Sequence, residues 1–203
     1  MPTPLLQGFS LGASLIIAIG SQNAYVLRQG LRKEYVFTVC TICFTCDVIL
    51  IVLGVAGFGT LIGSSTALML FARWGGALFL FLYGAKSFLS AFKTQVLLVD
   101  TSDKPATDFQ WAVATTLALT LLNPHVYMDT VVLLGSIAGQ LPEYERAAFA
   151  IGASLASLVW FYALGYGARI LTPLFNRPAA WKFLDVLIGC IMWTIAWNLV
   201  RTV

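Results

Sequence analysis

The sequence predicts an all-α integral membrane protein with six transmembrane helices, built as two inverted three-helix repeats in which the first and fourth helices are broken. Composition is the first reason. Of the 203 residues, 59% are hydrophobic and only 10% are charged, and the mean hydropathy of +0.86 lies outside the range of soluble domains. The second reason is six apolar runs, each long enough to cross a bilayer as a helix. They cover residues 5–27, 35–58, 73–92, 111–134, 146–164 and 181–200.

An internal repeat is the third reason. Residues 20–27 (GSQNAYVL) interrupt the first run, and residues 122–129 (LNPHVYMD) interrupt the fourth. Each unit holds three runs, and an odd number of crossings reverses direction, so the second unit is expected to be inverted. We therefore predict a first repeat at 1–92, a polar linker at 93–110 and a second repeat at 111–203. Five spans, with one segment only dipping into the membrane, is the alternative.

The distribution of basic residues predicts the orientation. With six spans, one side holds only Arg73, Arg146 and Arg201. The other side holds Arg28, Arg32, Lys33, Lys86, Lys93, Lys104, Arg169, Arg177 and Lys182. The positive-inside rule places the richer loops in the cytoplasm and both termini outside. The net charge of +3 is then explained by orientation and gives no reason to expect nucleic-acid binding.

The first run is expected to stay in the mature protein. No basic residue precedes Arg28, so the N-terminus lacks the positively charged region of a cleavable signal peptide.

Both interruptions contain residues that start helices. Asn123 followed by Pro124 is typical of an N-cap and the first residue of a new half-helix. Aligning the two segments on their tyrosines puts Ser21 opposite Asn123. Ser21 is therefore expected to cap an equivalent half-helix, with Gly20 permitting the turn.

The paired breaks are the predicted substrate site. Helix N-termini carry unpaired amides and partial positive charge, which suit a carboxylate. Irregular backbone at membrane depth is tolerated only where it lines a cavity or is buried in protein. Gln22, Asn23 and His125 would supply polar side chains, and Tyr127 and Trp160 are further candidates for the cavity wall. Simple kinks that shape packing are the alternative, which duplication at equivalent positions disfavours.

Asp47 is the most unusual acidic residue. It is the thirteenth residue of its run, near the bilayer centre, where an ionised carboxylate on an isolated helix costs at least ~2.5 kcal/mol. It shares a helix stripe with Cys40, Cys43 and Gly54, so this face is expected to contact other helices. Asp47 is a candidate for substrate binding or coupling. A structural ion pair with Arg73 is the alternative, and Arg73 is also a candidate gate residue.

Asp129 is the second candidate carboxylate. It shares a helix face with His125 at a four-residue spacing, so two carboxylates are expected to flank the breaks. His125 is the only histidine and is a candidate either for a proton relay or for a packing role held by hydrogen bonds. Asp185, one turn into the sixth run, is expected to reach the membrane interface.

No cofactor and no resident metal are expected. Cys40, Cys43 and Cys46 fit the interior of a membrane protein as small apolar residues. An aspartic membrane protease is disfavoured because the chain has no Gly-x-Gly-Asp sequence. A divalent metal-ion exporter of related membrane fold is the alternative to an amino-acid carrier, although the acids, the histidine and the cysteines do not cluster at ligand spacing on one helix.

The motifs resemble the lysine/arginine exporter (LysE) family of bacterial inner membranes, and most closely its arginine exporters. The likeness covers almost the whole chain. Its motifs are 20–24 (GSQNA), 29–32 (QGLR), Asp47, 73–76 (RWGG), 122–129 (LNPHVYMD) and 135–140 (GSIAGQ). The resemblance implies export of L-arginine, with L-lysine or canavanine as further substrates, and functional roles for Asp47 and Asp129. The family's usual Gly-Pro in the first break is Gly20-Ser21 here, which removes the rigid proline kink.

A basic amino acid needs an anion-binding site and at least one carboxylate. We expect its carboxylate at the helix starts after Ser21 and Asn123, and its cationic side chain at Asp129 or Asp47. Export of a cation opposes an inside-negative potential by ~2.3 kcal/mol per charge per 100 mV. Proton antiport is therefore predicted, with an aspartate that is protonated from outside. Small-residue helix faces would permit a homodimer, and the sequence leaves the oligomeric state open.

Overall fold

The computed structural model describes residues 3–17, 20–58, 66–92, 108–176 and 178–201, and all regular structure in these ranges is helical. Four helices are long and apolar enough to cross a membrane, and two bent helix pairs raise this number to six if each pair is one span. The predicted all-α membrane class is confirmed. The segments are α1 (Pro4–Ile16), α2 (Ser21–Arg32), α3 (Val36–Leu53), η1 (Gly54–Phe58), α5 (Thr66–Phe92), α6 (Phe109–Leu121), α7 (Pro124–Val126), η2 (Tyr127–Leu133), α8 (Leu134–Gly139), α9 (Glu143–Gly167), η3 (Ala168–Asn176) and α10 (Pro178–Arg201).

The predicted linker is only partly described. Residues 93–107 lie outside the described residues. Asp108 is the N-cap of α6, and Phe109 and Gln110, which were assigned to the linker, already belong to the helix. The helix starts two residues earlier than the predicted apolar run, and the Asp108 side chain makes no capping hydrogen bond.

The two bent pairs fall at the two predicted breaks. α1 and α2 meet at 83°, and α6 meets the segment starting at Pro124 at 56°. Asn123 is the predicted N-cap of the second break: its backbone is extended, and its Oδ1 accepts a hydrogen bond from the His125 amide at 3.1 Å. Pro124 is the first helical residue, as predicted.

The first break differs from the prediction by one residue. Gly20 is the N-cap, with φ −128° and ψ 178°, and Ser21 is the first residue of α2. Glycine is itself an acceptable N-cap. The Ser21 side chain is fully buried, and its hydroxyl has no hydrogen-bond partner among the described residues. Ser21 therefore does not cap the helix, and among the described residues no side chain takes that role at this break.

Two π-helical segments, η1 and η2, were not predicted. η1 lies against η2 and against the start of α8, where Gly54 of η1 and Gly135 of α8 cross. A Cβ atom at Gly54 would lie 2.7 Å from the Val131 carbonyl oxygen, and one at Gly135 would lie 2.6 Å from the Gly54 carbonyl oxygen. Only glycine permits this approach at either position. The crossing fixes the fourth span against the second span, a few residues beyond Asp129.

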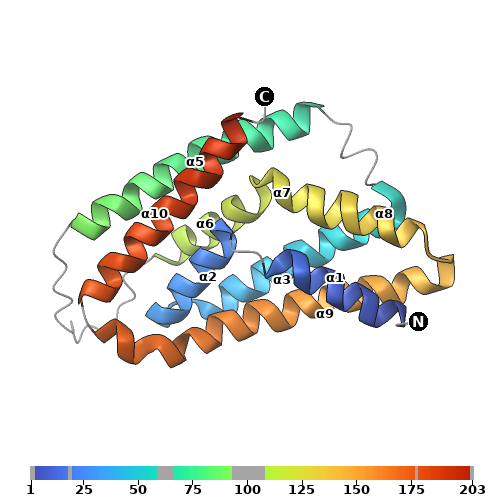
Figure 1. Cartoon of the computed structure of the whole chain (residues 1–203), viewed down its shortest axis with the longest axis horizontal. Coiled ribbons are helices and arrows are strands. Elements are labelled where there is room, and N and C mark those ends of the chain that lie inside the picture. The colour runs from blue at the N-terminus through green and yellow to red at the C-terminus, as the bar shows by residue number, and fades with distance from the viewer. Residues whose placement is uncertain (1–2, 18–19, 59–65, 93–107, 177, 202–203) are drawn as a thin grey trace.

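The remaining spans pack in pairs (Figure 1). α1 lies along α9, and α5 lies along α10. A Cβ atom at Gly152 would meet the backbone of Leu5, and one at Gly8 would meet the backbone of Phe149. α3 contacts α9 and α6. In terms of spans, the first packs on the fifth, the fourth on the second, the third on the sixth, and the second on the fifth.

All these spans run between the same two ends of the molecule. α2, α5 and α9 end toward the left of Figure 1, where α3, α6 and α10 begin. Among the described basic residues, Lys33, Arg169 and Lys182 therefore lie at one end, called the basic end below, and the N-terminus lies at the opposite end. That the basic end faces the cytoplasm stays a prediction.

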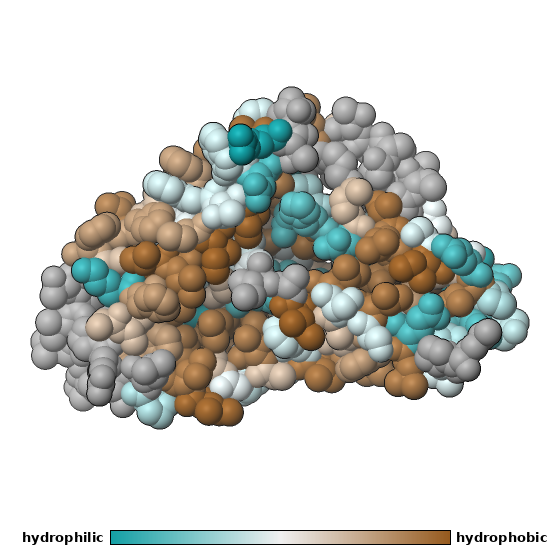
Figure 2. Space-filling view, viewed as in Figure 1, coloured by the Kyte–Doolittle hydropathy of each residue, from teal (hydrophilic) through white to brown (hydrophobic). Residues whose placement is uncertain are grey.

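The stripe predicted around Asp47 is buried against other helices. Its members are Cys40, Cys43, Asp47 and Gly54. On the opposite side of α3, Ile49 and Val52 are more than half exposed. Exposed apolar side chains on the outside of the bundle fit a surface in contact with lipid tails (Figure 2).

Candidate functional site

A cavity of about 310 Å³ lies between the two broken spans. Figure 2 shows hydrophilic residues gathered in the middle of a largely apolar face. The volume is at the lower end of the range for small-molecule sites. The last turn of α1, the starts of α2 and α7, and single turns of η2, α3, α9 and α10 form the wall. Its residues are Leu15, Ile16, Gly20, Gln22, Asn23, Asp47, Asn123, His125, Val126, Asp129, Thr130, Phe161, Ile195 and Asn198.

The cavity brings together most of the predicted site. Six of the predicted residues line it: Gln22, Asn23, Asp47, Asn123, His125 and Asp129. The two breaks and the two intramembrane acids therefore share one chamber, although they come from opposite halves of the sequence. Ser21, Arg73, Tyr127 and Trp160 are not part of this wall.

The start of α2 presents a donor to the cavity. The Gln22 Nε2 atom is buried beside the weakly accepting thiol of Cys43 and has no hydrogen-bond partner of ordinary geometry among the described residues. Because Gly20 has no side chain, the first amides of α2 also lack a side-chain cap. This helix start therefore offers several uncommitted N–H donors.

Asn23 holds the first break together. Its Nδ2 donates to the Ile16 carbonyl oxygen at 2.8 Å, which links α2 to the last turn of α1. Its Oδ1 accepts a hydrogen bond from Trp160 Nε1 at 3.2 Å. Trp160, predicted as a lining residue, thus contacts the cavity residue Asn23 and is not itself part of the wall. The same hydrogen bond connects the bent pair α1–α2 to α9.

Asp47 is the deepest carboxylate of the cavity, with only 3% of its surface exposed. Its Oδ2 accepts a hydrogen bond from Ser157 Oγ of α9 at 2.8 Å. Within the described part of the chain, no lysine or arginine forms an ion pair with it. An uncompensated carboxylate at this depth is costly when ionised, so a cation or a proton that enters the cavity has a ready partner.

The suggested ion pair of Asp47 with Arg73 is wrong. Arg73 Nε donates to the Leu199 carbonyl oxygen at 2.6 Å. Leu199 lies at the C-terminal end of α10, where helix carbonyls lack intrahelical partners and attract guanidinium groups. α5 lies along α10, which directs Arg73 to this helix end and away from the cavity.

Asp129 occupies the opposite wall, within the π-helical segment. Its backbone carbonyl accepts from the Leu134 amide, an i→i+5 bond, and its half-buried side chain lines the cavity together with His125. π-Helical turns are frequent at functional sites because they re-aim side chains.

Tyr127 has a different role from the predicted one, since its hydroxyl donates to the Leu121 carbonyl oxygen at 2.7 Å and ties the second break together.

Asp185 is buried in a contact between helices. It is 7% exposed, and its Oδ1 lies 3.0 Å from Arg28 Nη2. α10 packs against α2, which brings the two charges together. That Asp185 reaches the membrane interface stays a prediction.

Other residues of the site were not predicted from the sequence. Asn198, Thr130, Phe161 and Ile195 line the cavity, and Ser157 holds Asp47. Ser157 and Asn198 are polar residues inside apolar runs, so both carried a signal. Phe161 and Ile195 are ordinary apolar residues that only the packing identifies.

The site shows no metal-ion arrangement. Across residues 3–17, 20–58, 66–92, 108–176 and 178–201, no three His, Cys, Asp or Glu side chains are grouped to hold a metal ion. Cys40 and Cys43 are fully buried in the core, as expected of small apolar residues.

Comparisons with known proteins agree with the motifs. Residues 13–202 match the LysE type translocator family. The putative amino-acid transporter YggA of Aeromonas salmonicida is 44% identical over 195 residues, covering 96% of this chain and 94% of the relative. The arginine exporter protein ArgO of Serratia proteamaculans is 41% identical (96% and 94% covered), and that of Escherichia coli K12 is 39% identical (96% and 92% covered).

No solved structure matches the chain. The resemblance inferred from the motifs is confirmed, and it concerns transporters rather than enzymes. With its apolar helices and this match over nearly its full length, the chain is a multi-pass bacterial membrane protein that belongs to the LysE type translocator family.

Proposed function

We propose that this protein exports basic L-amino acids, L-arginine above all and L-lysine or canavanine as further substrates, from the cytoplasm across the bacterial inner membrane. One observation carries the proposal: Asp47 and Asp129 line a single cavity that also contains both helix starts. The names of the relatives, arginine exporter and amino-acid transporter, point to the same class of substrate.

The start of α2 is the preferred seat for the substrate carboxylate. Its first amides have no side-chain cap, and Gln22 adds a buried N–H group whose contact among the described residues is the weakly accepting Cys43 thiol. At the second break, the Asn123 side chain already accepts from the His125 amide, so fewer donors are free there. The partial positive charge at a helix N-terminus adds to the attraction for an anion.

The cationic side chain of the substrate would then lie between the two acids. Asp129 is the more accessible of the two, and Asp47 lies deeper. Arginine would make paired hydrogen bonds to a carboxylate, whereas lysine would make a single charge contact. This difference supports a preference for arginine at a site formed by carboxylates.

The environment of Asp47 supports proton antiport. A buried carboxylate without a cationic neighbour is satisfied either by a proton or by the substrate cation, but not by both at once. Binding of a proton from outside would release the substrate, and release of that proton inside would restore the site. Export against the membrane potential would be driven in this way.

The pairing of the spans supports two inverted repeats, at 1–92 and 111–203. If the first three spans are exchanged with the last three, the contact of the first with the fifth becomes that of the fourth with the second. The contacts between the third and sixth spans and between the second and fifth map onto themselves. Such an arrangement, with both termini in the periplasm, is typical of carriers that bind substrate between broken helices.

Efflux from reconstituted vesicles tests this function. Proteoliposomes preloaded with radiolabelled arginine, lysine, leucine or Cd²⁺ are placed in buffer of lower external pH, and release is followed with and without a protonophore. We expect release of arginine, weaker release of lysine, and loss of the stimulation when the protonophore collapses the gradient. Release of Cd²⁺ or leucine without arginine would contradict the proposal.

A further inference from the structure

A buried ion pair lies outside the cavity and has no part in the substrate site proposed above. Arg28 of α2 and Asp185 of α10 are 3.0 Å apart (Nη2 to Oδ1), with side chains only 12% and 10% exposed. The second terminal nitrogen of the Arg28 guanidinium, Nη1, donates to the Tyr83 hydroxyl of α5 at 3.4 Å. Three helices are therefore tied together at this one point.

The pair lies on one side of the cavity only. Along α2, Arg28 is six residues past Gln22, about 9 Å at the helical rise, in the direction of the Lys33 turn. Along α10, Asp185 precedes the cavity residue Ile195 by ten residues, about 15 Å. Both helices thus put the pair between the cavity and the basic end of the molecule.

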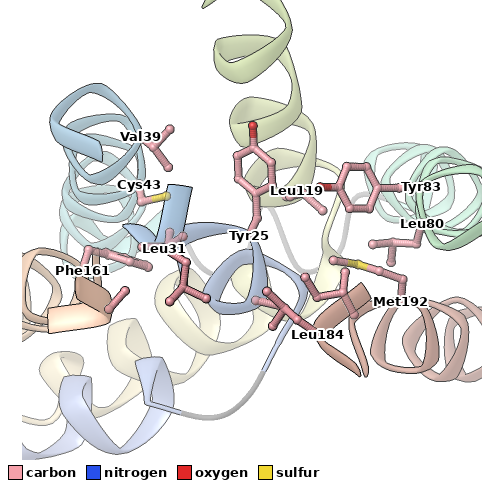
Figure 3. Close-up of a cluster of buried hydrophobic side chains, with 14 of the residues drawn as sticks. Tyr25, Leu31, Val39, Cys43, Leu80, Tyr83, Leu119, Phe161, Leu184 and Met192 are labelled. Carbon is pink, nitrogen blue, oxygen red and sulfur yellow. The ribbon is translucent and has the colours of Figure 1, made fainter. Parts of the chain in front are cut away.

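A tight layer of side chains separates the ion pair from the cavity. Tyr25 and Tyr83 meet edge to face at 6.1 Å between ring centres, and Gln29 Nε2 donates to the Tyr25 hydroxyl at 2.7 Å. Figure 3 shows Tyr25, Leu119 and Tyr83, from three different helices, converging side by side. All three residues are more than nine-tenths buried, so the substrate path is closed here.

We propose that the Arg28–Asp185 pair is the latch of a gate that closes the cavity toward the basic end, and that the guanidinium of an arriving substrate displaces Arg28 from Asp185 to open it. This inference rests on the proposed export of arginine. Asp185 would be the first carboxylate that the substrate meets, before Asp129 and Asp47.

Three properties distinguish a latch from a structural tie. Substrate arginine carries the same planar guanidinium as Arg28, so one group replaces the other without leaving Asp185 unpaired. The Asp185 Oδ1 atom has no hydrogen bond of good geometry among the described residues, which weakens the contact. Finally, α2 carries both Arg28 and the cavity residue Gln22 and begins at a bend, so tilting of one short helix would open the gate and alter the site together.

Side-specific labelling of the cavity tests the latch. Ile195→Cys places a thiol on the cavity wall, and its reaction with a membrane-impermeant maleimide is measured in right-side-out and inside-out vesicles. The parent protein with native cysteines gives the background, since Cys190 is exposed. We expect labelling from one side only in Ile195→Cys. Adding Asp185→Asn should raise labelling from the opposite side at least about fivefold by shifting the population of the open gate.

Two further variants keep the test decisive. Asp185→Asn leaves Arg28 buried without its partner and risks misfolding, so the neutral pair Arg28→Gln/Asp185→Asn is made as well and should open the gate equally. Asp108→Asn, which removes an exposed carboxylate, should leave the labelling unchanged. Unchanged labelling in both gate variants, with arginine efflux lost, would show a merely structural ion pair. If the parent protein itself releases no arginine, the proposed function fails instead, whatever the labelling shows.

Discussion

Two buried aspartates of this protein are satisfied in opposite ways. Asp185 has a guanidinium partner at 3.0 Å, whereas the partner of Asp47 is a neutral hydroxyl at 2.8 Å. Their exposed fractions are similar, 7% and 3%. The difference lies in their surroundings, because Asp47 lines the cavity and Asp185 lies behind the layer of Tyr25 and Tyr83.

The comparison shows that burial alone does not identify a functional carboxylate. A charge that is paired inside the protein is compensated before any ligand arrives. A carboxylate without a cationic partner, placed on a cavity wall, leaves its compensation to what enters the cavity. Asp47 therefore fits a substrate or proton site, and Asp185 fits a contact that is exchanged between protein and substrate.

The largest effect is expected from Asp47→Asn. The amide keeps the size of the side chain and still accepts the hydrogen bond of Ser157, but it binds neither a proton nor a cation. Proton-driven arginine efflux should fall by at least about a hundredfold, equivalent to the loss of ~2.7 kcal/mol. The melting temperature in detergent should not fall, since a costly buried charge is removed.

Radiolabelled efflux and a thermal melt of the same preparation check this prediction. Asp108→Asn, at an exposed position, is the matched control and should transport normally. Normal proton-coupled arginine efflux by Asp47→Asn would contradict the assignment of Asp47 to substrate or proton binding, which is what distinguishes it from Asp185.

The next effect is on the free energy of unfolding. Here Asp185→Asn is expected to be more destabilising than Asp47→Asn. Asp185→Asn leaves the Arg28 guanidinium buried without its counter-ion, a change that typically costs about 3–5 kcal/mol. The neutral pair Arg28→Gln/Asp185→Asn should recover most of this loss, and a double-mutant cycle on the unfolding free energy measures the coupling. If Asp185→Asn were no less stable than Asp47→Asn, the two aspartates would not differ in their compensation.

The sequence was sufficient to predict features set by local chemistry. Asn123 and Pro124 specify a helix start by residue type alone, and the depth of Asp47 follows from counting along its run. The small residues Cys40, Cys43 and Gly54 correctly indicated the buried face of that helix. Each of these features depends on residues within a few turns of one another.

Features set by contacts between distant helices could not be predicted in the same way. Ser157 meets Asp47 across 110 residues of sequence, and Arg28 meets Asp185 only because of how α2 and α10 are rotated. The π-helical segment that holds Asp129 lies beside the crossing of Gly54 and Gly135. Rotation and crossing of helices follow from the packing of the whole bundle, which explains why Arg73 was assigned the wrong partner.

The smallest effect is expected from removing the hydrogen-bond partner of Asp47. Ser157→Ala removes the hydroxyl that holds Asp47 but leaves the carboxylate in the cavity. Arginine efflux should fall by about tenfold, which corresponds to a hydrogen bond of ~1.4 kcal/mol, and proton coupling should persist. Ser136→Ala, which removes an exposed helical hydroxyl, is the control measured in parallel. A loss as complete as that of Asp47→Asn would mean that Ser157 takes part in binding or proton transfer, rather than only positioning the acid.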